Sequence, residues 1–123
     1  MRGIGAYARN QKVGVSQIDL VRLLFGEAVR RLRRLETYAP DDSRWIEDCH
    51  HVRAIVVEFL TALDPERGGA YVERMVPIYE WAIHTLLEVS ASRDTAEITP
   101  LREVFETLQQ GWHGMDAAQA GAA

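Results

Sequence analysis

Cysteine and long apolar runs are nearly absent from this chain of 123 residues. Cys49 is the only cysteine, so no disulfide forms within the chain, as is usual in a reducing compartment. No apolar run approaches the roughly 18 residues of a membrane-spanning helix. Residues 1–14 also lack the continuous apolar stretch of a secretory signal. We therefore expect a soluble, cytoplasmic protein that does not insert into membranes.

Basic residues are too few for a nucleic-acid-binding protein. The chain has 14 Lys and Arg against 18 Asp and Glu, which gives a net charge of −4. Arg30, Arg31, Arg33 and Arg34 do cluster, but an apolar helical stripe runs through them. We interpret them as a solvated face near the carboxyl end of a helix, where the helix dipole favours cations. We expect no nucleic-acid partner.

Sequence motifs that carry catalysis are also missing. The chain has no phosphate-binding loop, no HExxH zinc motif, no CxxC pair and no nucleophile elbow. Gly68-Gly69 follows a helical pattern rather than a strand, and it therefore predicts a turn and not a phosphate cradle. We expect neither enzyme activity nor a cofactor.

One cluster of potential metal ligands, Asp48-Cys49-His50-His51, leaves an alternative open. Adjacent residues on a helix point about 100° apart, so these side chains cannot all face one ion. Glu47 and His50 form one Glu-x-x-His motif, but the second copy that di-metal bundles use is missing. We interpret the histidines as surface or hydrogen-bonded residues without a metal. A metal-binding or redox bundle centred on Glu47, His50 and His51 remains the alternative.

Apolar residues recur at spacings of three and four in four segments, a pattern typical of amphipathic helices. The predicted helices cover about residues 17–38, 44–63, 69–92 and 100–115. Short connections make sequential helices antiparallel neighbours, so the fold class is an all-α, antiparallel up-down four-helix bundle. Residues 1–123 form one domain, with residues 1–15 as an N-terminal arm and residues 116–123 as a frayed tail.

Several residues mark where these helices begin, end or bend. Ser16 and Thr99 are the expected N-caps of the first and fourth helices. Asp64-Pro65 stops the second helix, and Gly68-Gly69 forms the following turn. Pro77 lies inside the third helix and predicts a kink, or else a later helix start.

The first three predicted helices carry more apolar surface than one core stripe needs. The additional residues are Leu20 and Leu23, then Ile46, Ile55 and Val57, and finally Tyr71, Ile78 and Trp81. One interpretation is a broader core. Another is a groove for a partner's amphipathic helix, which residues 46, 55, 57, 71, 78 and 81 would line and which Tyr7 and Val13 of the arm would cover when it is empty. A third is a homo-oligomeric structural bundle.

Motifs along residues 6–112 together resemble the FliS family of flagellar secretion chaperones. They are Ala6-Tyr7, Ser16-Gln17-Ile18-Asp19-Leu20, Leu23-Leu24-Phe25-Gly26-Glu27-Ala28, Leu60-Thr61-Ala62-Leu63-Asp64 before Gly68-Gly69, Ile78-Tyr79-Glu80-Trp81, and Val104 with Leu108 and Trp112. The sequence departs from the family pattern in four places, two of which are Pro77 inside the third helix and the proline-bearing connection before the fourth. Gln17 stands where proline is usual, and Phe25-Gly26-Glu27 stands where Tyr-Asp-Gly is typical.

The resemblance implies an export chaperone that is not an enzyme. Such proteins bind the disordered C-terminal segment of flagellin, prevent its premature polymerisation and support its secretion by the flagellar export apparatus. A segment that folds on binding loses conformational entropy, so a long, wrapped interface is expected. Contacts with the export apparatus or with flagellar regulators are further partners that the resemblance leaves open.

Overall fold

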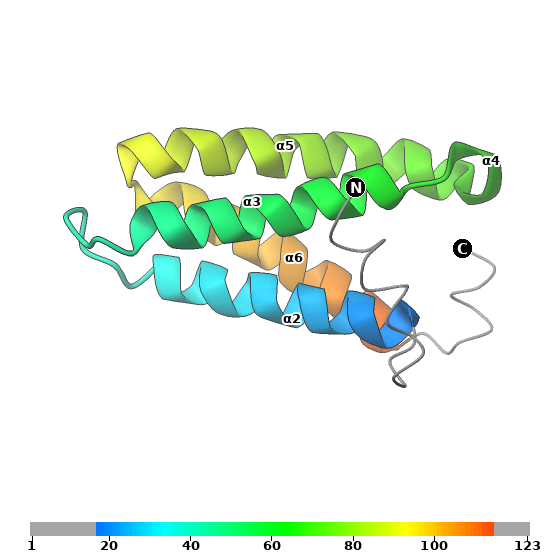
Figure 1. Cartoon of the computed structure of the whole chain (residues 1–123), viewed down its shortest axis with the longest axis horizontal. Coiled ribbons are helices and arrows are strands. Elements are labelled where there is room, and N and C mark those ends of the chain that lie inside the picture. The colour runs from blue at the N-terminus through cyan, green and yellow to red at the C-terminus, as the bar shows by residue number, and fades with distance from the viewer. Residues whose placement is uncertain (1–16, 115–123) are drawn as a thin grey trace.

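The computed structural model describes residues 17–114, and every regular element within them is helical. The long helices are α2 (Gln17–Leu35), α3 (Trp45–Ala62), α5 (Ala70–Ser92) and α6 (Ile98–His113), with the short helices α4 (Pro65–Gly68) and η2 (Thr95–Glu97) between them. The four long helices run antiparallel in chain order (Figure 1). The predicted all-α bundle is therefore confirmed. The arm at residues 1–15, the Ser16 cap and the tail at residues 116–123 lie outside the described residues.

The four long helices associate mainly as two pairs. α3 packs along α5, and α2 packs along α6, whereas α5 and α6 approach each other over a shorter stretch. Figure 1 shows α6 starting beside the end of α5 and then crossing towards the start of α2. α3 lies between α2 and α5 and joins the two pairs.

Aromatic rings from all four long helices meet in the core. Phe25 of α2 stacks on Phe59 of α3 with ring centroids 4.5 Å apart, and Phe105 of α6 lies 5.9 Å from Phe25. Tyr79 of α5 lies 5.7 Å from Phe59. These four residues are at most 5% exposed. Burying a side chain of this size contributes about 2–3 kcal/mol relative to exposure, so the cluster is a main source of stability.

The turn between α3 and α5 follows the predicted signals. α3 ends at Ala62, and the Asp64 carboxylate accepts a hydrogen bond of 3.0 Å from the backbone N–H of Glu66. Pro65 then opens the single turn of α4, because its fixed φ suits a first helical position. Gly69 has a φ of 47°, a conformation that glycine adopts without strain. The stop and the turn are confirmed, while the short helix between them was not predicted.

Two predicted helix ends were wrong. α2 ends at Leu35 rather than at residue 38, and Tyr38 is buried in the turn that follows. α6 begins at Ile98, so Thr99 is inside the helix and is not its N-cap. Burial of Ile98 draws the chain into the helix directly from η2. The Thr99 hydroxyl instead donates a hydrogen bond of 2.6 Å to Glu36, the first residue after α2.

α5 runs without a break through Pro77. A later helix start, one of the two predicted outcomes, is therefore wrong, and a kink stays a prediction. Proline cannot bond to the carbonyl four residues earlier, which here belongs to Glu73. Both residues are exposed, so water can satisfy that carbonyl. This placement on the solvent side explains why the helix tolerates the proline.

Candidate functional site

Five large apolar side chains are exposed on the described part of the molecule. They are Leu23 at 64%, Ile46 at 61%, Leu87 at 46%, Val57 at 41% and Trp81 at 39% exposure. Single exposed apolar residues are common on soluble proteins, but adjacent ones mark interaction sites. Two of these five, Ile46 and Leu87, line the same surface pocket.

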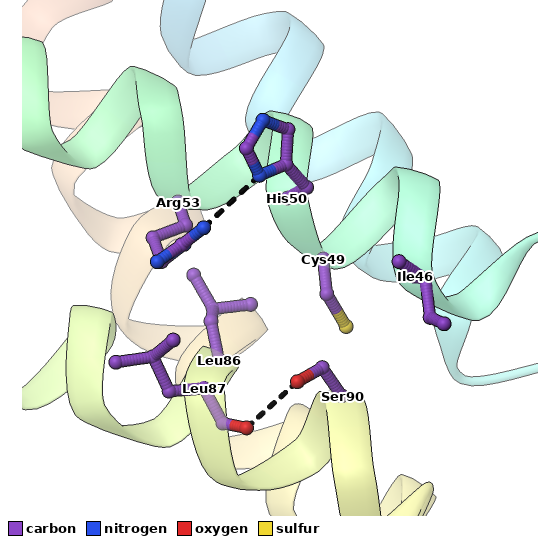
Figure 2. Close-up of a pocket in the computed structure, with 7 residues that line it drawn as sticks. All are labelled: Ile46, Cys49, His50, Arg53, Leu86, Leu87 and Ser90. Atoms are coloured by element: carbon purple, nitrogen blue, oxygen red, sulfur yellow. Dashed lines mark hydrogen bonds between the residues drawn. The ribbon is translucent and has the colours of Figure 1, made fainter.

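This pocket lies between α3 and α5 and is called the α3/α5 pocket below (Figure 2). Its volume is about 90 Å³, and its lining consists of Ile46, Cys49, His50 and Arg53 from α3 with Leu86, Leu87 and Ser90 from α5. The Ser90 hydroxyl donates a 2.7 Å hydrogen bond to the Leu87 carbonyl, so it is satisfied within its own helix. The pocket is therefore apolar with a basic edge.

Ile46, Arg53 and Val57 lie on one flank of α3, since they follow each other at helical spacings of seven and four residues. Val57 thus continues the exposed apolar surface about one turn beyond Arg53. On α5, Ile83 and Leu87 are one turn apart and face the same side. Leu87 was not predicted, although its spacing of four from Ile83 was a usable signal.

Ile55 departs from the expectation for this surface. It is 5% exposed and belongs to the core cluster. Nine residues separate it from Ile46, which places the two on opposite sides of a helix at about 100° per residue. Ile55 therefore offers no free surface beside Ile46 and Val57. Leu20 is likewise buried, at 6% exposure, so it supports the core as well.

Tyr71, Ile78 and Trp81 share a different flank of α5, called the Trp81 flank below. Tyr71 and Ile78 are half-buried against the core, and Trp81 is the exposed member. Burial raises the pKa of the Tyr71 hydroxyl, an effect that Tyr79 and Trp112 beside it partly offset. Tyr71 is thus tied into the protein while Trp81 remains available.

The predicted contact residues that the structure describes are distributed over the core and two exposed surfaces. Six residues separate Trp81 from Leu87, which places them about 120° apart around α5. The Trp81 flank and the α3/α5 pocket are therefore two surfaces on either side of the exposed face of α5. The other two predicted residues, Tyr7 and Val13 of the arm, lie outside the described residues.

A buried carboxylate that was not predicted joins α2 to α3. Asp48 is 1% exposed. It accepts hydrogen bonds from Arg31 at 2.6 Å, from Arg34 at 2.7 Å and from the Tyr38 hydroxyl. Burial alone would raise the pKa of Asp48, but these three donors outweigh burial and lower it. A signal was present, since Asp48 lies at helical spacing between Trp45 and Val52 on the buried stripe.

The arginine cluster on α2 is therefore more than a solvated face. Arg31 and Arg34 hold the buried Asp48, and Arg33 pairs with Glu106 of α6. Arg30 and Arg31 also bind Glu27, and these bonds lower the pKa of Glu27 to about 2. The cluster is a structural one that binds α2 to both neighbouring helices.

The potential metal ligands point in different directions. His51 lies 4.0 Å from Glu27 of α2, whereas His50 contacts Arg53 beside the α3/α5 pocket. Cys49 is buried, and burial raises the pKa of its thiol to about 11, so it stays protonated. Within residues 17–114, no three His, Cys, Asp or Glu side chains gather as a metal site requires.

The chain is similar to proteins of one known family. The family model described as flagellar protein FliS matches residues 2–119. Flagellar secretion chaperone FliSB of Pseudomonas aeruginosa is 33% identical over 54 residues, which cover 44% of this chain and 43% of that protein.

No solved structure matches the chain. Among the described residues, no helix is both long and apolar enough to cross a membrane. The family match covers nearly the whole chain, including all four long helices and both exposed surfaces of α5. The chain therefore belongs to the family of the flagellar protein FliS.

Proposed function

We propose that this protein is a cytosolic export chaperone that binds the C-terminal segment of flagellin and keeps it from polymerising before secretion. The observation that carries the proposal is the exposed apolar surface on both sides of α5, in a chain of the FliS family. Amphipathic segments bind such surfaces through apolar anchors spaced along a helix. Handing flagellin to the export apparatus is part of the proposal. No catalytic step is needed for it.

Trp81 is the proposed central contact on its flank. Tryptophan contributes a large contact area at a small entropic cost and is frequent among residues that dominate binding energy. Trp81 is exposed enough to reach a partner, and the opposite face of its helix is packed in the core. Ile78 and Tyr71 extend the same flank towards the start of α5.

The test is calorimetric titration of the full chain with the C-terminal segment of flagellin from the same bacterium. Binding at or below tens of micromolar is expected, and no heat at that concentration would end the proposal. Trp81→Ala should weaken binding by about tenfold or more, as for a residue that anchors an interface. Its thermal midpoint should stay near that of the unchanged chain. His84→Ala, at another exposed position of α5, is the matched control.

The same apolar surface would also serve a homo-oligomer. Sedimentation over a concentration series separates the two functions, because an oligomer gains mass with concentration in the absence of flagellin. A monomer that becomes a one-to-one complex on adding the flagellin segment favours the chaperone.

Tyr7 and Val13 enter the proposal as arm residues that cover the surface when it is empty. Deleting residues 1–13 should then raise the affinity for the flagellin segment or cause self-association. Unchanged affinity and unchanged mass would remove the arm from the proposal while leaving flagellin binding intact.

A further inference from the structure

The α3/α5 pocket carries a positive charge although the whole chain is acidic. The chain carries a net charge of −4, yet the charged residue that lines this pocket is Arg53, and no acidic residue lines it. Glu80 is the acidic residue on the same stripe of α5 as Leu87, and it lies about two turns away. The end of the α3/α5 interface near Ile46 is therefore suited to a partner that brings a negative charge.

Arg53 differs from the arginines of α2 because no carboxylate within the described residues pairs with it. It is half-buried, and within residues 17–114 it takes part in no ion pair. Its neighbour is His50, whose ring nitrogen Nδ1 lies 3.0 Å from the Arg53 nitrogen Nη2 (Figure 2). Each arginine of α2 pairs with an acid: Arg22 with Asp19, Arg30 and Arg31 with Glu27, Arg33 with Glu106, and Arg34 with Asp48.

The contact with His50 also fixes the position of Arg53. The guanidinium is always charged and only donates hydrogen bonds, so Nδ1 of His50 is the acceptor in this contact. The other N–H groups of Arg53 remain for a ligand. A planar guanidinium with several donors in fixed geometry binds a carboxylate through two hydrogen bonds.

The apolar part of the pocket is suited to one aliphatic side chain. Ile46 and Leu87 project on its two sides, and Cys49 and Leu86 are its buried members. A volume of about 90 Å³ is several times the space that a single water needs. The Cys49 thiol stays protonated, so it presents an apolar and uncharged surface.

We propose that the α3/α5 pocket binds an amphipathic helix that carries an aliphatic side chain and, about one turn away, a carboxylate. The aliphatic side chain enters between Ile46 and Leu87, and the carboxylate pairs with Arg53. This inference rests on the proposed function, because the helix belongs to the flagellin segment. An apolar contact alone would allow the helix to slide along α3 and α5, whereas the ion pair fixes its register.

The experiment measures binding of the flagellin segment to two variants of the full chain by calorimetry. Leu87→Ala should weaken binding about fivefold, as for loss of one apolar contact. Arg53→Glu should weaken it about 30-fold at low salt, and the deficit should shrink in 0.5 M NaCl because salt screens the repulsion. Leu23→Ala on α2 and Arg67→Glu on α4 remove the same groups from other exposed positions and should bind normally.

A charge-swapped ligand makes the test specific. Each Asp or Glu of the flagellin segment is replaced in turn by Lys, and each peptide is titrated against Arg53→Glu. One peptide should recover most of the lost affinity for Arg53→Glu while binding less well to the unchanged chain.

The possible outcomes separate this inference from the function on which it rests. If the unchanged chain binds the segment but Leu87→Ala and Arg53→Glu bind equally well, the pocket is not used and the chaperone function stands. Equal losses of affinity in the two control variants would also overturn the proposed role of the pocket, since the effect would then not be specific to it. If the unchanged chain fails to bind the segment at all, both the function and the inference are overturned.

Discussion

The α2/α6 and α3/α5 interfaces are the two extensive helix pairs of the bundle, and their polar chemistry differs. Polar groups link α2 and the turn after it to α6: Glu36 of that turn accepts hydrogen bonds from Thr99 and Arg102, and Arg33 of α2 pairs with Glu106. The buried contacts between α3 and α5 are chiefly aromatic and apolar, such as Phe59 against Tyr79 at a ring distance of 5.7 Å. The exposed residues along the second pair include Ile46, Val57 and Leu87.

This difference separates a structural surface from a binding surface. Charged groups that already hold partners have little to offer a ligand, and they fix the spacing of the two helices. An exposed apolar edge contributes little to the fold, because its side chains stay in contact with water. These side chains contribute favourable free energy only when a partner covers them and removes them from water. We therefore expect substitutions in the polar contacts made by α2 to affect stability, and substitutions of exposed apolar residues on α3 and α5 to affect binding.

The largest effect on stability is expected at Asp48. Asp48→Asn keeps the shape but removes the charge that Arg31, Arg34 and Tyr38 surround. Breaking a buried charge cluster in this way should lower the free energy of unfolding by about 3 kcal/mol. Urea unfolding at pH 7 measures the loss, and Asp41→Asn at an exposed position is the control. Affinity for the flagellin segment should stay unchanged under conditions where the variant is folded.

The pH dependence of the same variant shows whether the charge of Asp48 is responsible. The pKa of Asp48 is lower in the folded protein than in the unfolded chain. Its contribution is therefore complete above about pH 4, the usual carboxyl pKa, and is lost as the pH falls through the folded value. The difference in stability between the unchanged chain and Asp48→Asn should shrink steadily below pH 4. A difference that stays constant down to pH 2 would contradict this assignment.

A smaller effect is expected at the link between α2 and α6. Glu36→Gln weakens the bonds to Arg102 and Thr99 on a partly exposed edge. Such an ion pair contributes about 1 kcal/mol, which corresponds to a fall of roughly 3–6 °C in Tm for a domain of this size. Thermal unfolding followed by circular dichroism measures it. A loss of flagellin affinity without a loss of stability would break the proposed division between the two interfaces.

The smallest effect on stability is expected at Val57. Val57→Ser replaces an exposed apolar side chain on α3 and should change the free energy of unfolding by less than about 0.5 kcal/mol. Binding of the flagellin segment should nevertheless weaken a few-fold, because Val57 continues the surface beyond Arg53. Denaturation and calorimetry on the same sample compare the two quantities. A large fall in stability would place Val57 in the core instead.

The predicted helices and their order could be obtained from apolar spacing alone. The stop at Asp64-Pro65 and the turn at Gly69 were also correct, because these residues restrict the backbone locally whatever surrounds them. The start of α6 was not, since burial of Ile98 outweighed the local preference of Thr99 for a cap position. Ile46 and Val57, two candidates for the groove, are exposed, whereas Ile55 was grouped with them against its helical angle.

The sequence by itself determined the amphipathic helices, the antiparallel connections and the excess of apolar side chains, since each follows from spacing within a short segment. The tertiary structure alone decided which helices pair closely, because that choice depends on how side chains distant in sequence fit together. It brought Asp48 to Arg31 and Arg34, and it placed Ile46 opposite Leu87 beside Arg53, which forms no ion pair within residues 17–114. Packing between helices thus divided one apolar excess into a core and two separate exposed surfaces.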